Sequence, residues 1–277
     1  DPTSTHIFED LGITINDGGS LVLSQSADGQ SWYNASAKDL KMSGNATMVF
    51  DAANGFSNVN ADLEGTASIT VQKAQVANLN FNSLKMKSGT SVKILDGDAD
   101  KTNINIGTAG SAIAGTVDAN NSNIYFTAGT LDNNGGSISA KQMKVLKPAS
   151  GEPELTINGG SVSGEFVPAT DGIGGSAIDT TITLMGVSVN NVTYADGVSL
   201  GKDSTVTMSG NLGIGDTINA DLTVEDLAYL TDDLTIPEGK TLTISGYGTL
   251  DMLNHNIKIE GTLVIERNGV VTSSVTG

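Results

Sequence analysis

The sequence predicts an all-β fold, a parallel β-helix (β-solenoid) with three short strands in each coil of about 20–23 residues. Three observations predict it. Apolar and polar residues alternate in short segments, a glycine recurs between consecutive segments, and the segments return at a regular spacing. The alternative is one or more antiparallel β-sandwiches, which also contain many short alternating strands.

Alternation of apolar and polar residues identifies the strands. In Ile69-Thr70-Val71, Val92-Lys93-Ile94 and Ile104-Asn105-Ile106, two apolar residues flank one polar residue. Successive side chains of a strand point to opposite faces, so each segment buries one face and exposes the other to solvent. The apolar positions favour Val, Ile and Leu, and the first two of these are enriched in strands.

A glycine separates many of these segments, two or three residues after the last apolar residue of a strand. Glycine adopts positive φ without a steric penalty, so a glycine between two strands indicates a tight change of direction. The same strand–glycine–strand unit recurs as Ile13/Ile15–Gly18–Leu21/Leu23, Leu63–Gly65–Ile69/Val71, Leu84/Met86–Gly89–Val92/Ile94 and Ile236–Gly239–Leu242/Ile244.

Spacing distinguishes the solenoid from the sandwich. Every third segment near the C-terminus returns after 23, 21 and 20 residues, from 234 to 257, 242 to 263 and 250 to 270. Repeats of this length indicate stacked coils, whereas sandwich strands are longer and their turns recur every 8–12 residues. At about 22 residues per coil, the sequence predicts about a dozen coils.

The domain organisation follows from the same pattern. We expect one β-solenoid domain over residues 1–277, with a possible loop or seam near 147–175, where three prolines and a glycine cluster would interrupt a ladder. The only segment with helical spacing is Thr223–Leu230. Neither end offers a convincing cap, so we expect the chain either to continue in a longer parent protein or to stack end to end with another copy.

Composition excludes several classes of function. Lys and Arg number 14 against 31 Asp and Glu, giving a net charge of −17 with a single arginine. Binding to nucleic acid needs clustered cations, so no nucleic-acid partner is expected. No apolar run reaches the roughly 20 residues of a transmembrane helix. The absence of cysteine excludes a disulfide scaffold, a cysteine zinc site and a thiol nucleophile.

No catalytic constellation is evident in the sequence. Its two histidines, His6 and His255, lie near opposite ends of the chain. The adjacent acids Asp232 and Asp233 are the best candidates for the carboxylate pair of glycosidic cleavage, but adjacent strand residues point to opposite faces. We therefore expect a turn with solvated acids, no catalytic residues and no cofactor-binding residues.

One acidic segment is a candidate metal site. Asp96, Asp98 and Asp100 place carboxylates at every second position, as many calcium-binding loops do. The complete twelve-residue loop needs glycine at its sixth position and an acid at its twelfth, where this chain has Lys101 and Gly107. The segment is either a weak Ca²⁺ site or an acidic surface turn, and Ca²⁺ is the only cofactor considered.

The strand–glycine–strand coils at Ile13–Leu23, Leu84–Ile94 and Leu234–Val271 resemble those of bacterial and archaeal surface β-helices. These include autotransporter passenger domains, filamentous-haemagglutinin-type adhesins, and surface-layer or sheath proteins. The resemblance implies a right-handed, extracellular β-helix, and parallel crossovers are in general right-handed. It covers most of the chain and carries no catalytic motif.

Two classes of function remain. The first is a non-enzymatic, extracellular structural or adhesive protein of the cell surface, whose partners are other copies of itself or glycans and proteins of a host or neighbouring cell. It would build a filament, sheath or surface layer. The alternative is a polysaccharide-active β-helix, a lyase or hydrolase. One arginine, few aromatic residues and a charge of −17 disfavour the alternative, because acidic sugars would be repelled.

Overall fold

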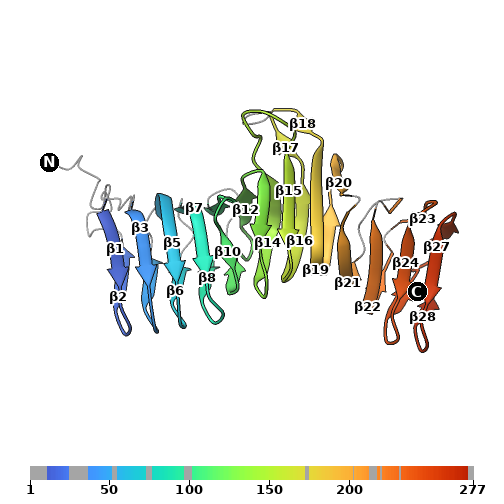
Figure 1. Cartoon of the computed structure of the whole chain (residues 1–277), viewed down its shortest axis with the longest axis horizontal. Coiled ribbons are helices and arrows are strands. Elements are labelled where there is room, and N and C mark those ends of the chain that lie inside the picture. Colours follow the sequence, from blue (N-terminus) through green and yellow to red (C-terminus); the bar gives the residue numbers. More distant parts are fainter. Residues whose placement is uncertain are drawn as a thin grey trace. The chain divides into compact units, whose positions relative to one another are not determined.

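The computed structural model describes residues 11–24, 37–51, 55–72, 77–96, 102–171, 175–201, 203–211, 217–218, 220–230 and 232–273. Every element in these ranges is a β-strand, and none is a helix (Figure 1). No segment of the described chain is therefore a helix that could span a membrane. The strands divide between two compact units, an N-terminal unit (Asp1–Leu146) and a C-terminal unit (Lys147–Gly277).

Parallel pairing confirms the β-solenoid. Strands about 23 residues apart stack on one another, and the solenoid makes about nine turns. The antiparallel sandwich is wrong, because the walls of both units are built from parallel pairs. The expected dozen coils is too many, because several coils are longer than 22 residues. Ser20 pairs with Thr47 and Ser91 with Thr116, which are steps of 27 and 25 residues.

The described strands of the N-terminal unit form three walls, named here A, B and C. Three long strands bend at a corner and serve two walls each. Wall A contains the first parts of β5 (Gly55–Leu63) and β7 (Ala77–Met86), β9 (Thr102–Ile106), β12 (Asn123–Phe126) and the end of β14 (Ser137–Val145). Wall B contains β1 (Leu11–Ile15), β3 (Ala37–Met42), the ends of β5 and β7, β10 (Ala112–Ile113) and β13 (Gly129–Asp132). Wall C contains β2 (Ser20–Ser24), β4 (Thr47–Asp51), β6 (Ser68–Val71), β8 (Ser91–Ile94), β11 (Thr116–Asp118) and the start of β14.

The C-terminal unit has the same three-walled plan. Wall D contains β15 (Glu154–Asn158), the start of β19 (Thr180–Tyr194) and β20 (Val198–Leu200), and β23 (Leu234–Ile236) pairs with β26 (Ile257–Ile259). Wall E contains the start of β16 (Ser161–Val167), the middle of β19, most of β21 (Thr205–Asn211), the start of β22 (Asp221–Tyr229), β24 (Thr241–Ile244) and β27 (Thr262–Ile265). Wall F contains the ends of β16, β19, β21 and β22, then β25 (Thr249–Asp251) and β28 (Val270–Thr272).

One hairpin departs from the parallel plan. β17 (Ala169–Thr170) and β18 (Ala177–Ile178) pair antiparallel, the only such pair among the described strands, and extend from the corner between β16 and β19. The Lys147 ammonium lies 2.7 Å from the carboxylate of Asp171, the residue that directly follows β17. Residues 147–175 also contain β15 and β16, and the expectation of a single domain over 1–277 stays a prediction.

Aliphatic columns fill the interior. Along wall C, the inward position is occupied in successive coils by Met48, Ile69, Val92, Val117 and Ile138, which pair in register and are all buried. The neighbouring outward position carries only hydroxyl side chains, namely Ser20, Thr47, Ser68, Ser91, Thr116 and Ser137. Each buried aliphatic side chain contributes about 1.5–3 kcal/mol, so the columns supply the main force that holds neighbouring coils together.

The predicted turn glycines are confirmed. Gly18, Gly65, Gly89 and Gly239 all have positive φ, between 70° and 91°. Successive corners also stack closely, since a Cβ on Gly65 would lie 2.6 Å from the carbonyl oxygen of Gly44. Glycine is therefore required at this corner both by the backbone conformation and by the approach of the preceding coil.

The segment with helical spacing, Thr223–Leu230, forms no helix, because its residues up to Tyr229 lie in β22. Leu222 and Val224 are buried on the inner face of wall E. Ala228 and Leu230, later in the chain, are buried as well. Leu227 lies between them with 53% of its surface exposed. The three-residue spacing arose because the strand turns a corner between two walls, not because it follows a helical period.

Candidate functional site: the final coil

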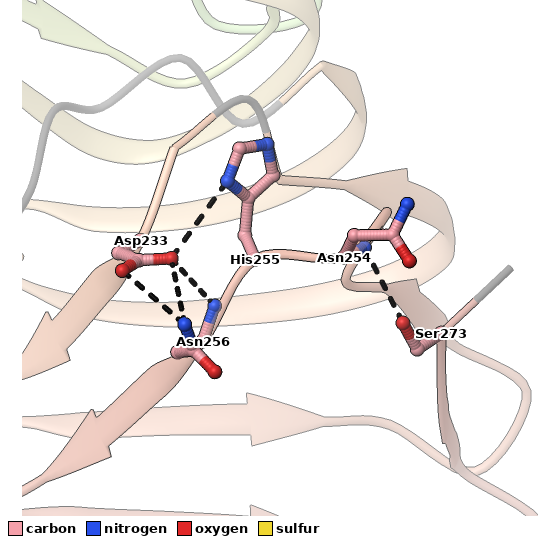
Figure 2. Close-up of polar contacts among 5 residues, drawn as sticks. All are labelled: Asp233, Asn254, His255, Asn256 and Ser273. Carbon is pink, nitrogen blue, oxygen red and sulfur yellow. Dashed lines mark hydrogen bonds and ion pairs between the residues drawn. The ribbon is translucent and has the colours of Figure 1, made fainter. Parts of the chain in front are cut away.

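Figure 2 shows where the structure places the candidate acid Asp233. The backbone N–H of Asn256 donates to the Asp233 Oδ1 atom at 2.7 Å. The Asn256 side-chain amide donates to both carboxylate oxygens, at 3.2 and 3.3 Å. Asp233 therefore joins the corner that precedes β23 to the corner one coil later, and its carboxylate satisfies a backbone donor there.

These contacts also fix the charge state of the carboxyl group. The hydrogen bond from the Asn256 backbone lowers the pKa of Asp233, and the Asn256 amide and the nearby His255 ring lower it further. The general acid of a glycosidase needs a raised pKa so that it holds a proton to donate. The pKa of Asp233 is lowered instead, so its carboxylate stays ionised and accepts hydrogen bonds between two corners.

The remaining predicted candidates are not assembled into a site. Asp232 is exposed beside Asp233, and the His255 Nδ1 atom lies 3.8 Å from the Asp233 carboxylate at the rim (Figure 2). Asn254, next to this histidine, donates its backbone N–H to Ser273 Oγ at 3.3 Å. His6 lies outside the described residues.

Only one residue of the predicted calcium site lies within the described residues. Asp96 is exposed directly after β8, while Asp98 and Asp100 lie outside the described residues. Within the described ranges, no three His, Cys, Asp or Glu side chains gather closely enough to hold a metal ion. Binding of Ca²⁺ at Asp96, Asp98 and Asp100 therefore stays a prediction.

The final coil is formed by β26, β27 and β28, and its apolar residues continue the core columns of the coil before. Ile257, Ile259, Leu263, Ile265 and Val271 pair in register with Leu234, Ile236, Leu242, Ile244 and Leu250. Each of the five residues of the earlier coil has at most 1% of its surface exposed. In the coil of β26, β27 and β28, by contrast, Ile259 and Ile265 are each 51% exposed, so the described residues leave these two core positions uncovered.

The backbone of the final coil is open as well. Among the described strands, β26, β27 and β28 pair only with β23, β24 and β25 of the preceding coil. Their other edges present a row of N–H and C=O groups, which is a template for pairing with another chain. An apolar centre framed by three parallel edges is thus suited to receive one further coil.

The rim of the final coil carries charges of both signs. Lys258 pairs with Glu260 at 2.6 Å. Glu266 accepts the backbone N–H of Gly246 at 3.1 Å, and Arg267, the only arginine of the chain, is exposed beside it. Two of the 14 cationic side chains of the protein therefore lie on this coil.

No family model, curated protein or solved structure was found to match the chain. The fold and the final coil are accordingly the basis for a functional proposal. The sequence analysis expected no convincing cap at either end, which stays a prediction, and it did not single out Ile259 and Ile265. Their place in the alternating pattern of the most C-terminal described strands is the signal that could have found them.

Proposed function

We propose that this protein is a non-enzymatic structural or adhesive component of the cell surface that assembles end to end outside the cell. The observation that carries the proposal is the coil of β26, β27 and β28, where Ile259 and Ile265 are half exposed and no described strand pairs with the outer edges. Exposed apolar surface framed by unpaired strand edges is a feature that natural proteins avoid unless a partner covers it.

The partner is the first coil of a second copy. An occupant of this surface must present parallel strands with inward aliphatic residues at alternate positions. β1 and β2 of this same chain have this pattern, with Ile13, Ile15, Leu21 and Leu23. Contact between the final coil of one copy and the first coil of the next is heterologous, and repetition of a heterologous contact that does not close gives a filament.

Charge disfavours contact between two N-terminal segments. The final coil is balanced, because Lys258 and Arg267 are matched in number by Glu260 and Glu266. Residues 1–37 contain five carboxylates, at Asp1, Glu9, Asp10, Asp17 and Asp28, and no lysine or arginine. Like charges repel, so two acidic N-terminal segments avoid each other and pairing of this segment with the balanced final coil is preferred.

The test is to block the final coil without disturbing the walls. Ile259→Lys and Ile265→Lys place a charge on the open apolar surface, and both are expected to abolish assembly. Leu227→Lys is the matched control, because Leu227 is similarly exposed, at 53%, on a wall of the same unit. Light scattering and electron microscopy across a concentration series should show fibres for the wild type and for the control.

Two results would overturn the proposal. One is a wild type that stays a monodisperse monomer at every concentration. The other is a Leu227→Lys variant that loses assembly as completely as Ile259→Lys, since association would then not depend on the final coil. Circular dichroism of each variant checks that the β-structure is intact.

A further inference from the structure

A groove of about 350 Å³ lies on the N-terminal unit beside wall A. Its lining includes the side chains of Asn58, Asn80, Asn82 and Asn105, which come from three consecutive coils. The volume falls in the range of small-molecule sites, which is roughly 300–1,000 Å³. The groove is separate from the final coil, which belongs to the other unit.

The lining is polar but carries no charge. Ten residues line the groove, four of them are asparagines, and none is charged. This composition is unusual in a chain with a net charge of −17. An uncharged amide offers two donors and one acceptor oxygen, so it can recognise hydroxyl groups without attracting ions.

Contacts between coils hold the amides in place. The Asn105 amide nitrogen donates to Asn80 Oδ1, one coil earlier on the same outward column. The Asn82 amide nitrogen donates to the carbonyl oxygen of Asn58 at 3.1 Å. Among the described residues, the Asn80 amide nitrogen and the Asn105 amide oxygen have no protein partner, so a donor and an acceptor are available to a ligand.

The shape of the groove depends on a close backbone contact. Gly107 donates its N–H to the carbonyl oxygen of Phe81 at 2.8 Å. A Cβ at Gly107 would lie 2.1 Å from the carbonyl oxygen of Asn82, so no larger residue fits there. The groove is therefore held by fixed backbone contacts between neighbouring coils, and its amides are positioned before a ligand arrives.

Apolar surface borders the amides. Leu146 lines the groove with 41% of its surface exposed, and Ala109 is exposed on the turn beside it. Tyr125 does not line the groove itself, but it pairs in register with Asn105 and extends the outward column of Asn80 and Asn105 by one coil beyond it. Uncharged amides next to an aliphatic side chain and an aromatic ring match a ligand that has hydroxyl groups at its edge and C–H groups on its faces.

We infer that this groove binds a neutral oligosaccharide. Its hydroxyl groups would exchange hydrogen bonds with Asn80 and Asn105, and its apolar faces would contact Leu146 and Tyr125. Acidic sugars and nucleic acids are disfavoured, because no cation lines the groove to pair with them. The inference rests on the adhesive part of the proposed function and names its ligand class, while end-to-end assembly depends on other residues.

The experiment is calorimetric titration of the wild type with neutral hexasaccharides of glucose and of mannose, and with hexagalacturonic acid as the charged comparison. Ala109→Trp fills the groove from an exposed turn and removes no hydrogen bond. Ala112→Trp is the matched control, because Ala112 is exposed on wall B outside the groove. Leu146→Ala removes apolar surface without filling the groove.

At least one neutral hexasaccharide is expected to bind, with affinity lowered about tenfold or more by Ala109→Trp, lowered more modestly by Leu146→Ala and unchanged by Ala112→Trp. The inference is overturned if no neutral sugar binds, if hexagalacturonic acid binds as tightly, or if Ala109→Trp and Ala112→Trp behave alike. Thermal unfolding of each variant separates loss of the site from loss of the fold. If binding is absent while the wild type still forms fibres, the inference fails and end-to-end assembly stands.

Discussion

At the scale of single residues, the corner glycines carry two separate constraints. Gly65 and Gly110 have nearly the same backbone conformation, with φ of 70° and 75°. They differ in their surroundings, because a Cβ on Gly65 would meet the backbone of Gly44, whereas a Cβ on Gly110 would meet no atom within 4 Å. Alanine substitutions at these two glycines therefore distinguish the free-energy cost of a positive φ from the cost of a clash between stacked corners.

We expect Gly110→Ala to lower the free energy of unfolding by about 1–2 kcal/mol, which is the usual cost of placing a side chain in the left-handed region. Gly65→Ala should lower it by roughly 1–3 kcal/mol more, because the corner of the preceding coil, at Gly44, must also move. Urea unfolding followed by circular dichroism measures both values. Equal losses for the two variants would show that the corners do not stack as closely as described.

At the scale of elements, side-chain contacts between corners reinforce the ladders between strands. Asp233 and Asn256 join the corners that precede β23 and β26, and Asp17 and Asn45 join two corners of the N-terminal unit in a similar way. Such contacts place an acceptor opposite backbone N–H groups that no strand partner reaches. Corners with an Asp or Asn facing the next coil are therefore part of the stacking.

The Asp233 contact predicts a pH dependence. Its pKa is lowered in the folded protein, so its contribution to stability is present above the ordinary aspartate value of 3.8 and is lost as the pH falls below it. Asp233→Asn should therefore reduce the acid-induced loss of stability between about pH 5 and pH 3. Asp232→Asn is the control at the adjacent exposed acid. Thermal unfolding across this pH range tests the idea, and identical profiles for wild type and Asp233→Asn would contradict it.

The elements show what could be predicted from the sequence and what could not. Strands such as β6 and β8 were predictable because Ile69, Val71, Val92 and Ile94 alternate strictly with polar residues, and the glycines marked the turns. The strand that contains Leu227 could not be predicted in this way, because the alternation of apolar and polar residues is interrupted where a strand bends around a corner.

The number of coils and the groove also could not be predicted from the sequence. The number of coils depends on how many residues are inserted at the corners, and the spacing of the strands in the sequence does not reveal these insertions. The groove depends on residues such as Asn80 and Asn105, which are 25 positions apart and become neighbours only in the stacked register. Asp233 was noticed in the sequence as an acid, but its structural role required its contact with Asn256.

At the scale of the whole molecule, charge opposes association. The protein carries −17, and residues 147–277 hold seventeen carboxylates against five cationic side chains. Individual ion pairs at an exposed end contribute only about 0–1 kcal/mol, so mutual repulsion between copies outweighs them at low salt. Screening of this repulsion should favour assembly.

We therefore expect fibres to lengthen as NaCl is raised from about 10 to 150 mM, because the screening length falls from about 30 to 8 Å. CaCl₂ at the same ionic strength is expected to act more strongly if the acidic segment at Asp96, Asp98 and Asp100 binds Ca²⁺, as the sequence predicts. Light scattering with and without a chelator measures the effect. Particle size that is indifferent to calcium would contradict the proposed role of the divalent ion.

Register along the walls has a consequence for the evolution of such a chain. Because each coil meets only the coils directly before and after it, a duplication or deletion of one complete repeat leaves every remaining junction with a compatible neighbour. A gene for this protein could thus change the number of repeats by recombination, and relatives of different length would keep the same cross-section.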